Sequence, residues 1–273
     1  MVRSSGSASS NSMNIIVCLK QVPGTTQVKI DPQTNTLVRS GIKSILNPFD
    51  YYALEEGVRI KERYGGKVTV VSMGPPDADA MLKEAIGLGA DDPVLLSDRE
   101  FAGSDTLATS YTLSQAMRKI GQYDLIICGR QTLDGDTGQV GPELAQMLGL
   151  PFIAYVSKVE EIANGNMRVQ RMVDEGHETI ETLLPAVITV TKEINVPRLP
   201  SFRGLVKARN AKIPVWTAAD IQADKASTGR AGSATVVVKT FVPVRVRTGQ
   251  VLSGTAEEQV DALIVKLRET KVI

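Results

Sequence analysis

Runs of apolar, β-branched residues alternate with helical patterns along most of the chain, and this alternation constrains the fold more than any other feature of the sequence. Several runs are nearly unbroken, which is typical of strands that are covered on both faces. Glycines follow the helical patterns as stop signals. We therefore predict an α/β fold with a mostly parallel sheet. The expected strands are 14–20, 67–73, 93–97, 125–129 and 186–191, and the expected helices are 51–64, 77–88, 105–120 and 142–148.

The pattern changes to period two from residue 155, which predicts an antiparallel meander up to about residue 183. Asn164-Gly165 suits a type I′ turn within it, and Asp174-Glu175-Gly176 suits a longer turn. Residues 197–214 are basic and interrupted by prolines, so we expect an exposed loop there. Residues 225–235 are rich in Gly, Ser and Ala, as in a flexible connector.

These signals divide the chain into three parts. Residues 1–12 are a Ser/Gly-rich expression remnant, residues 13–220 form the α/β domain, and residues 221–273 form an extended arm with a C-terminal helix. That helix follows Thr255, where Thr-Ala-Glu-Glu is a capping-box pattern. Its apolar residues at helical spacing need a surface to pack on. They are Val260, Leu263, Ile264 and Leu267.

Charge and cysteine content exclude several classes of protein. The 31 Lys and Arg residues nearly balance 30 Asp and Glu residues, so no global field attracts the chain to nucleic acid or anionic lipid. No stretch approaches the ~20 apolar residues that span a bilayer. Cys18 and Cys128 lie in apolar runs, so we expect reduced, buried thiols in a cytoplasmic protein. With the single histidine, His177, they do not provide the clustered ligands of a zinc site.

Residues 123–150, YDLIICGRQTLDGDTGQVGPELAQMLGL, are the most informative segment, because an apolar strand leads through a polar, glycine-rich turn into a helix. This order is typical of phosphate binding, since backbone N–H groups at a helix start are unpaired donors. The expected donors are the N–H groups of 137–140, just before Pro142. Glycines at 135, 138 and 141 let the backbone approach a ligand.

Helix capping and a tight turn alone could also account for this segment. Neither a GxGxxG motif nor a P-loop occurs, and Asp134 and Asp136 could simply cap a helix. Two carboxylates beside a phosphate are unfavourable unless they point away or accept a hydroxyl proton, as from a ribose. The segment therefore suits a nucleotide better than free phosphate.

Two further strand ends support a binding crevice. Met73-Gly74 ends a predicted strand, and Asn47-Pro48-Phe49-Asp50 precedes a predicted helix with Asp50 as a plausible cap. Turn chemistry alone also accounts for both segments. Ligands of open α/β sheets bind beyond the carboxyl ends of the strands. Cys18 is also expected near such an end and could line the ligand.

A basic segment follows the last predicted strand. Its charges could form a solvated face, but apolar residues lie among them, as in a protein-docking element. The basic residues are Arg198, Arg203, Lys207, Arg209 and Lys212, and the apolar residues are Leu199, Phe202, Leu205 and Val206.

These motifs resemble those of the β subunit of electron-transfer flavoproteins over residues 13–273. The motifs are IIVCLKQVPGTTQVKID, SILNPFDYYALEEGVRIKE, VTVVSMGPP, CGRQTLDGDTGQVGPELAQMLGLP and LPAVITVTKEINVPRLPSFRGLVKA. The resemblance implies an adenine-nucleotide α-hydrolase-like (Rossmann-like) fold and a heterodimer with an FAD-carrying α subunit. Conventional members hold a structural AMP in this subunit.

In the electron-bifurcating branch of the family the same pocket resembles an FAD site. The resemblance implies that NADH delivers hydride to this FAD. Electrons then pass to ferredoxin or flavodoxin and, through the α-subunit FAD, to a partner flavin dehydrogenase of the acyl-CoA or lactate dehydrogenase type. No protein side chain is expected to be catalytic, because the flavin carries the redox chemistry.

The turn favours the bifurcating branch. Conventional sequences tend to read Asp-Asp-Asp-Cys-Asn-Gln-Thr, whereas residues 134–140 read Asp-Gly-Asp-Thr-Gly-Gln-Val, with room for a second phosphate. The stretch 23–32 is also similar to that branch. We therefore expect FAD rather than AMP. The implied cofactor-binding residues are Cys18, Asn47, Pro48, Phe49, Asp50, Met73, Gly74, Gly129, Arg130, Gln131, Thr132, Asp134, Gly135, Asp136, Thr137, Gly138, Gln139 and Val140.

Two of these residues have alternative roles. Arg130 could lend positive charge near phosphate or flavin, or form a surface ion pair. Asp136 is a candidate for a ribose contact or a helix cap.

The resemblance also implies a partner-docking loop and a subunit contact. The docking residues are Leu199, Pro200, Ser201, Phe202, Arg203, Gly204, Leu205, Val206 and Lys207. The helix over residues 255–270 would lie against the α subunit. Two alternatives remain: a purely structural, AMP-binding β subunit, and a stand-alone nucleotide-binding regulatory module, although the SGGxDS loop of ATP pyrophosphatases is absent.

Overall fold

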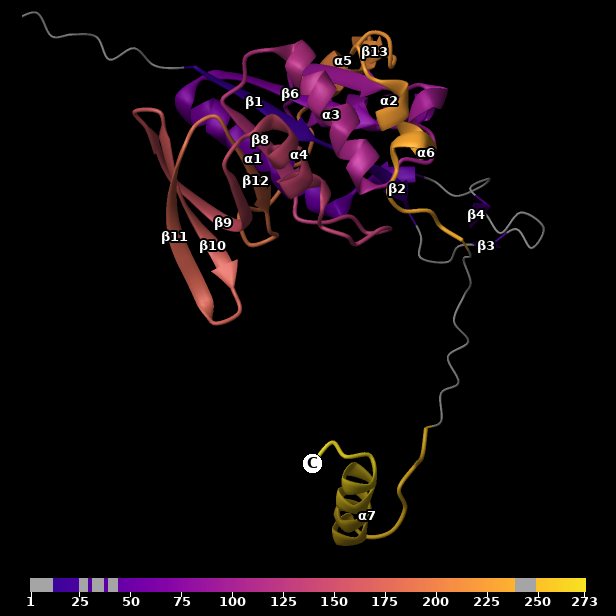
Figure 1. Ribbon diagram of the computed structural model, residues 1–273. Helices are drawn as coiled ribbons and strands as arrows, with labels where there is room; N and C mark the ends of the chain where they lie inside the picture. Colours follow the sequence, from indigo (N-terminus) through magenta and orange to yellow (C-terminus); the bar gives the residue numbers. More distant parts are fainter. Residues whose placement is uncertain (1–11, 25–28, 31–36, 39–43, 239–248) are drawn as a thin grey trace, which may run out of the picture.

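The computed structural model describes residues 12–24, 29–30, 37–38, 44–238 and 249–273, and a nine-stranded sheet is its central feature (Figure 1). From edge to edge the strands are β11 (Gly176–Leu183), β10 (Asn166–Val173), β9 (Phe152–Ala163), β12 (Ala186–Val190), β8 (Leu125–Gly129), β1 (Met13–Cys18), β6 (Gly66–Met73), β7 (Asp92–Leu96) and β13 (Val215–Trp216). The seven strands from β9 to β13 in this order pair in parallel. The predicted α/β fold with a mostly parallel sheet is confirmed.

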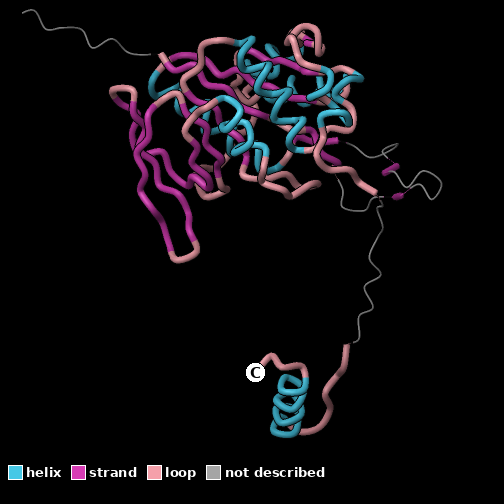
Figure 2. Tube along the Cα trace, viewed as in Figure 1, coloured by secondary structure: helices cyan, strands magenta, loops and turns pink. Residues whose placement is uncertain are grey.

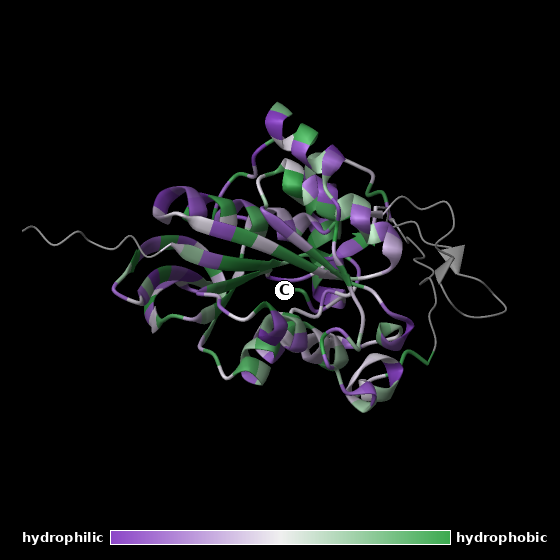
Figure 3. Ribbon diagram, turned by 90° about the horizontal axis from the view of Figure 1, so that it is seen from above, coloured by the Kyte–Doolittle hydropathy of each residue, from purple (hydrophilic) through white to green (hydrophobic). Residues whose placement is uncertain are grey.

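Helices cover both faces of the sheet (Figure 3). The helices are α1 (Pro48–Tyr64), α2 (Asp79–Gly87), α3 (Thr106–Ile120), α4 (Val140–Leu148), α5 (Phe202–Asn210), α6 (Gly229–Gly232) and α7 (Ala256–Glu269), with 3₁₀ turns at η1 (Pro76–Ala78), η2 (Arg99–Phe101) and η3 (Lys225–Ser227). Ile15 and Val17 pack with α1 and α2, whereas Ile16 packs with α3 and α4 on the other face. This double coverage explains why the strand sequences are almost continuously apolar.

The order of the strands creates a switch point beside β1. The chain passes from β1 through α1 to β6 and then through α2 to β7. Helix α3 then carries it back across β1 to β8, so α1 and α4 cover opposite faces of the sheet. Ligands of open α/β sheets bind at such a point, beyond the carboxyl ends of the strands.

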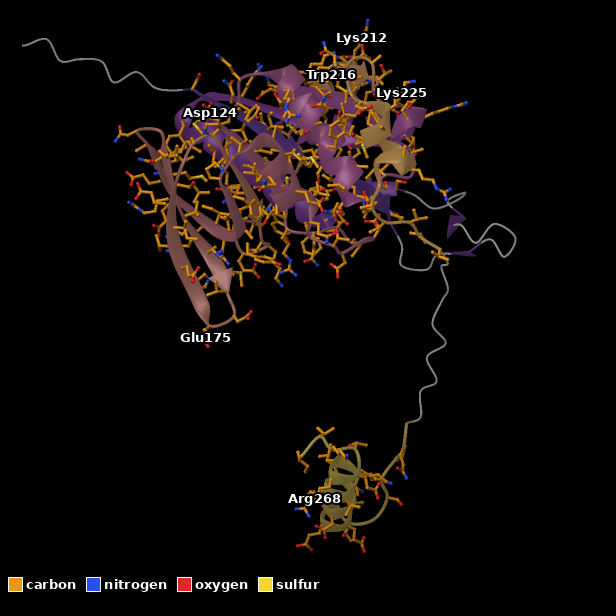
Figure 4. All side chains as sticks on the ribbon, in the orientation of Figure 1. Asp124, Glu175, Lys212, Trp216, Lys225 and Arg268 are labelled. Carbon is orange, nitrogen blue, oxygen red and sulfur yellow. The ribbon has the colours of Figure 1, made fainter. Side chains whose placement is uncertain are left out.

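The predicted meander is confirmed as the antiparallel strands β9, β10 and β11, which project from the body of the molecule (Figure 2). Asn164 and Gly165 both have positive φ, 53° and 77°, as a type I′ turn requires. The expectation of a longer second turn is wrong. Gly176 pairs with Val173, so only Asp174 and Glu175 form the turn, and Figure 4 labels Glu175 at this tip.

The expected exposed loop over 197–214 contains helix α5, which corrects the prediction. No proline falls within α5, and Ser201 caps it by accepting the Gly204 N–H at 3.0 Å. Helix α5 packs against α2 so closely that a Cβ on Gly204 would lie 2.4 Å from the Gly87 carbonyl oxygen. Glycine at this position therefore permits the helix contact.

Residues 225–235 are also more ordered than their composition predicts. Instead of a flexible connector they form η3 and α6, and Thr228 is buried. The Thr235 N–H donates to Asp105 at 2.8 Å, which fixes the end of this segment to the start of α3. Small residues therefore permit close packing here. The predicted domain boundary at residue 220 stays a prediction.

Two strand pairs lie outside the large sheet, β2 (Gln21–Pro23) with β5 (Ser44–Leu46) and β3 (Lys29–Ile30) with β4 (Leu37–Val38). The stretch 23–32, which sequence similarity linked to the bifurcating branch, lies mostly outside the described residues.

The predicted C-terminal helix is confirmed as α7, with Thr255 and Glu258 forming both hydrogen bonds of a capping box. Val260, Leu263 and Ile264 are exposed on α7. No helix within the described part of the chain is long and apolar enough to cross a membrane.

Candidate functional site

Three strand ends meet at the switch point. Cys18 ends β1, Met73 ends β6 and Gly129 ends β8, and these strands are neighbours in the sheet. Cys18 and Cys128 are register partners on β1 and β8, and both are free thiols. They are far apart in the sequence, but the fold brings them side by side. Within the described ranges no group of three or more His, Cys, Asp or Glu side chains could hold a metal ion.

Asn47 connects the start of α1 to the turn after β8. Its side-chain amide donates to Asp50 Oδ1 and to the Gln131 carbonyl, both at 2.9 Å. Its side-chain oxygen accepts the Leu133 N–H at 3.1 Å. Because Asn47 is fully buried, these three bonds leave little freedom for the first residues of the turn.

Asp50 lies inside α1, so the prediction that it caps the helix is wrong. The helix begins at Pro48 after Asn47, and Asp50 points instead toward the loop after β1, where it accepts the Lys20 N–H at 2.7 Å. Burial raises the pKa of Asp50 to about 7, although hydrogen bonds from Lys20 and Asn47 oppose the shift.

Gly129 allows β8 to approach this carboxylate. A Cβ at this position would lie 2.4 Å from Asp50 Oδ1 and 2.9 Å from the Phe49 carbonyl carbon. Only glycine fits such an approach without moving α1. Asn47, Asp50, Lys20 and Gly129 thus form one packed group, which we call the strand-end cluster.

The 130–139 turn presents unpaired donors. Among the described residues, no acceptor receives the backbone N–H groups of Thr137, Gly138, Gln139 or Val140. Helix α4 starts at Val140 without a side-chain cap, which leaves these groups at its N-terminus. The predicted donor cluster is therefore in place, and phosphate oxygens are its natural acceptors.

Gly135 and Gly138 of this turn are glycine for different structural reasons. Gly138 has φ +63°, and a Cβ there would lie 3.3 Å from the Arg130 carbonyl oxygen. Gly135 has no such backbone requirement, and the nearest atom to an added Cβ is Thr132 Oγ1 at 3.5 Å. Its missing side chain therefore leaves space rather than permitting a conformation.

Neither carboxylate of the turn caps α4, so that alternative is wrong. Asp134 Oδ1 accepts the Lys20 ammonium and the Gly135 N–H, each at 2.8 Å. Burial raises the pKa of Asp134, but the charge of Lys20 and the hydrogen bonds from Lys20, Thr132 and Gly135 together hold the pKa below its usual value. Asp136 accepts the side-chain amide of Gln131 and has φ 53°. Both carboxylates thus have partners away from the free N–H groups.

Arg130 is held by aromatic rings. Its guanidinium lies 5.5 Å from the ring centroid of Phe49 and 6.0 Å from that of Tyr155. No Asp or Glu of the described residues forms an ion pair with it, so the surface ion pair is not found. Its Nε is buried without a hydrogen-bond partner within the same residues. A buried orphan donor of this kind fits an anionic ligand.

Sequence reasoning missed Lys20, Leu133 and Tyr155. Lys20 is the last residue of the predicted strand 14–20, and its position two residues after Cys18 could have signalled the site. Tyr155 reaches Arg130 through a strand irregularity at positive φ, 58°, which has no sequence signal.

A hollow of about 720 Å³ lies elsewhere, at the amino-terminal edge of the sheet. It is lined by Ser12, Asn14, Gly121, Gln122, Tyr123, Asp124 and Pro185. None of the predicted site residues is among them.

The predicted docking residues form an exposed apolar group on and before α5. Leu199 and Phe202 are 87% and 85% exposed, and Leu205 and Val206 are about half exposed. Arg198, which the sequence placed in a solvated basic face, instead bonds to Glu55 at 2.8 Å and to Glu62 at 2.6 Å. It anchors the segment that leads into α5.

Comparison with known proteins agrees with the resemblance. The electron transfer flavoprotein domain matches residues 34–221. The electron transfer flavoprotein subunit beta of Thermoanaerobacterium thermosaccharolyticum is 49% identical over 96% of this chain and 100% of its own length. Subunit CarD of the caffeyl-CoA reductase-Etf complex of Acetobacterium woodii is 43% identical over 96% and 100%. Protein FixA of Bradyrhizobium diazoefficiens is 43% identical over 92% and 90%. The chain therefore belongs to the electron-transfer flavoprotein family, as a β subunit.

Proposed function

We propose that this β subunit holds FAD rather than AMP at the switch point and serves as the NADH-oxidising subunit of an electron-bifurcating flavoprotein. FAD bound here would accept hydride from NADH. It would pass one electron to ferredoxin or flavodoxin and the other, through the α-subunit FAD, to a partner flavin dehydrogenase. Similarity to a subunit of a caffeyl-CoA reductase-Etf complex supports a role within a larger assembly.

The observation that carries this proposal is the free donor group at the start of α4. Four consecutive N–H groups, those of residues 137–140, have no acceptor among the described residues, as at helix N-termini that bind phosphate groups. Gly135 has no side chain in the same turn, and a Cβ there would meet only Thr132 Oγ1, at 3.5 Å. A diphosphate uses both features, because its two phosphates need several donors and more room than one.

The residues around this group have separate tasks. Asn47 and Asp50 fix the turn, so the N–H groups are preorganised before a ligand binds. Arg130 places positive charge beside two aromatic rings, where it stabilises an anionic group. Phe202 and its apolar neighbours present the surface for the partner dehydrogenase.

Anaerobic titration with NADH tests the proposal. The heterodimer with its α subunit, loaded with flavin, should lose its flavin absorbance with two equivalents of NADH, because two flavins accept four electrons. A heterodimer that NADH does not reduce would contradict the proposal and favour the structural, AMP-binding role.

A further inference from the structure

The main chain of Lys20 is held in place, whereas its ammonium forms an ion pair with Asp134 that can be exchanged for another. Its backbone N–H donates to the buried Asp50 carboxylate at 2.7 Å, which holds the main chain at the end of β1. Its ammonium reaches across to the 130–139 turn and pairs with Asp134 at 2.8 Å. The two side chains are 45% and 36% exposed, so water solvates both charges and the pair adds little net stability.

Asp134 does not depend on Lys20 for a hydrogen-bond partner. Its Oδ1 also accepts the Gly135 N–H at 2.8 Å, so the carboxylate keeps a donor if the ammonium leaves. The free N–H groups of residues 137–140 follow three residues later in the same turn. An anion bound to them would occupy the same turn as Asp134 and would attract the same ammonium.

We infer that Lys20 exchanges partners when a nucleotide binds: its ammonium leaves Asp134 and pairs with a phosphate oxygen. This inference rests on the proposed nucleotide site and adds a residue to it. Lys20 thereby has two roles, as it neutralises Asp134 in the free protein and contributes a charge-assisted hydrogen bond in the complex. The fixed main chain restricts the movement to the side chain.

Calorimetric titration with ADP tests the exchange. The heterodimer would be used with FAD in the α subunit alone, so that ADP reports on the β-subunit site. Lys20→Met should weaken ADP binding about tenfold, because a charge-assisted bond is lost and the Asp134 carboxylate no longer has a cation beside it. Asp134→Asn should tighten ADP binding several-fold, and both effects should shrink at high salt.

The double variant separates exchange from simple neutralisation. If Lys20 bonds to phosphate, Lys20→Met combined with Asp134→Asn still binds ADP about tenfold more weakly than Asp134→Asn alone. If Lys20 only neutralises Asp134, the two variants bind equally, and that result overturns the inference. Lys20→Arg keeps the charge and should bind within about threefold of the wild type.

Two controls complete the experiment. Lys67→Met breaks a similar exposed pair with Asp92, at 3.1 Å, on the amino-terminal edge of the sheet, where Asp124 also lies (Figure 4). ADP binding should be unchanged in that variant. If the wild-type heterodimer itself does not bind ADP, the nucleotide site of the proposed function is rejected. If the double variant and Asp134→Asn bind ADP equally, only the phosphate contact of Lys20 is rejected.

Discussion

Single residues hold the strand-end cluster together. Asp50 joins three segments, since it accepts hydrogen bonds from Lys20 and Asn47 and lies against Gly129. Its carboxylate therefore fixes the main chain after β1 and the Asn47 side chain.

Asp50 should give the protein a specific pH dependence. Its pKa in the folded protein is about 7, above the unfolded value of 3.8. Its contribution to the free energy of unfolding is therefore fully present below about pH 4 and is lost as the pH rises to about 7.

Asp50→Asn removes that dependence. The wild type should exceed the variant in free energy of unfolding at low pH, and the difference should fall by at most about 4 kcal/mol between pH 4 and 7. Urea unfolding of both proteins across this range measures it. A difference that is constant with pH would contradict the assignment.

Gly138 tests the room for a diphosphate. Gly138→Asn should weaken FAD retention about tenfold, because the new side chain occupies space beside the free N–H groups. Asparagine is among the residues that tolerate a φ of +63° best, although its Cβ would lie 3.3 Å from the Arg130 carbonyl oxygen. Flavin released from the purified heterodimer is the measurement.

Gly149→Asn is the matched control for that variant. Gly149 has φ +67° at the end of α4 and no atom within 4 Å of an added Cβ. FAD retention should stay at the wild-type level in this control. Unchanged retention in Gly138→Asn as well would count against the proposed position of the diphosphate.

Among the elements, α1 connects the proposed nucleotide site with the proposed docking surface. Asn47, which precedes α1, bonds both to Asp50 in its first turn and to the 130–139 turn. Farther along, Glu55 and Glu62 hold Arg198, just before α5. One helix therefore positions both proposed regions.

Arg198→Met should lower the free energy of unfolding by about 2 kcal/mol. Glu55 is 4% exposed and would lose its strongest partner, although Arg59 still contacts it at 2.7 Å. Urea unfolding measures the loss. Arg203→Met, which changes an exposed arginine of α5, should cost less than about 0.5 kcal/mol, and equal effects of both variants would refute the anchoring role.

Phe202→Ala should slow electron transfer to the partner dehydrogenase about tenfold or more, because exposed apolar residues in a polar surround are typical binding hot spots. Flavin content and unfolding should not change, since the side chain is 85% exposed. Leu183→Ala, an exposed apolar residue at the end of β11, is the control. Loss of flavin together with electron transfer would contradict a docking role.

The sequence predicts elements better than contacts. Apolar runs located β1, β6, β7, β8 and β12, since burial on both faces leaves a strong pattern. Helix α5 was missed because the prolines around 197–200 hid a helix that is stabilised by one Ser201 cap and a close approach to α2. The 130–139 donors could be predicted from glycines and Pro142. The Lys20–Asp134 and Arg130–Phe49 contacts could not, because they join segments that are far apart in sequence.

On the scale of the whole molecule, two helices of the described residues, α5 and α7, carry groups of exposed apolar side chains. The docking residues are exposed on and before α5, and Val260, Leu263, Ile264 and Val265 are exposed on α7. A capped helix with an exposed apolar stripe is typical of a subunit contact. We therefore interpret α7 as the contact with the α subunit and α5 as the contact with a dehydrogenase.

Counting the nucleotides released from the native heterodimer tests the central claim most directly. If the glycine-rich turn holds a dinucleotide, denaturation and chromatography should release two FAD molecules per heterodimer and no AMP. Release of one FAD and one AMP from a fully loaded heterodimer would contradict the account and leave this subunit without a redox role.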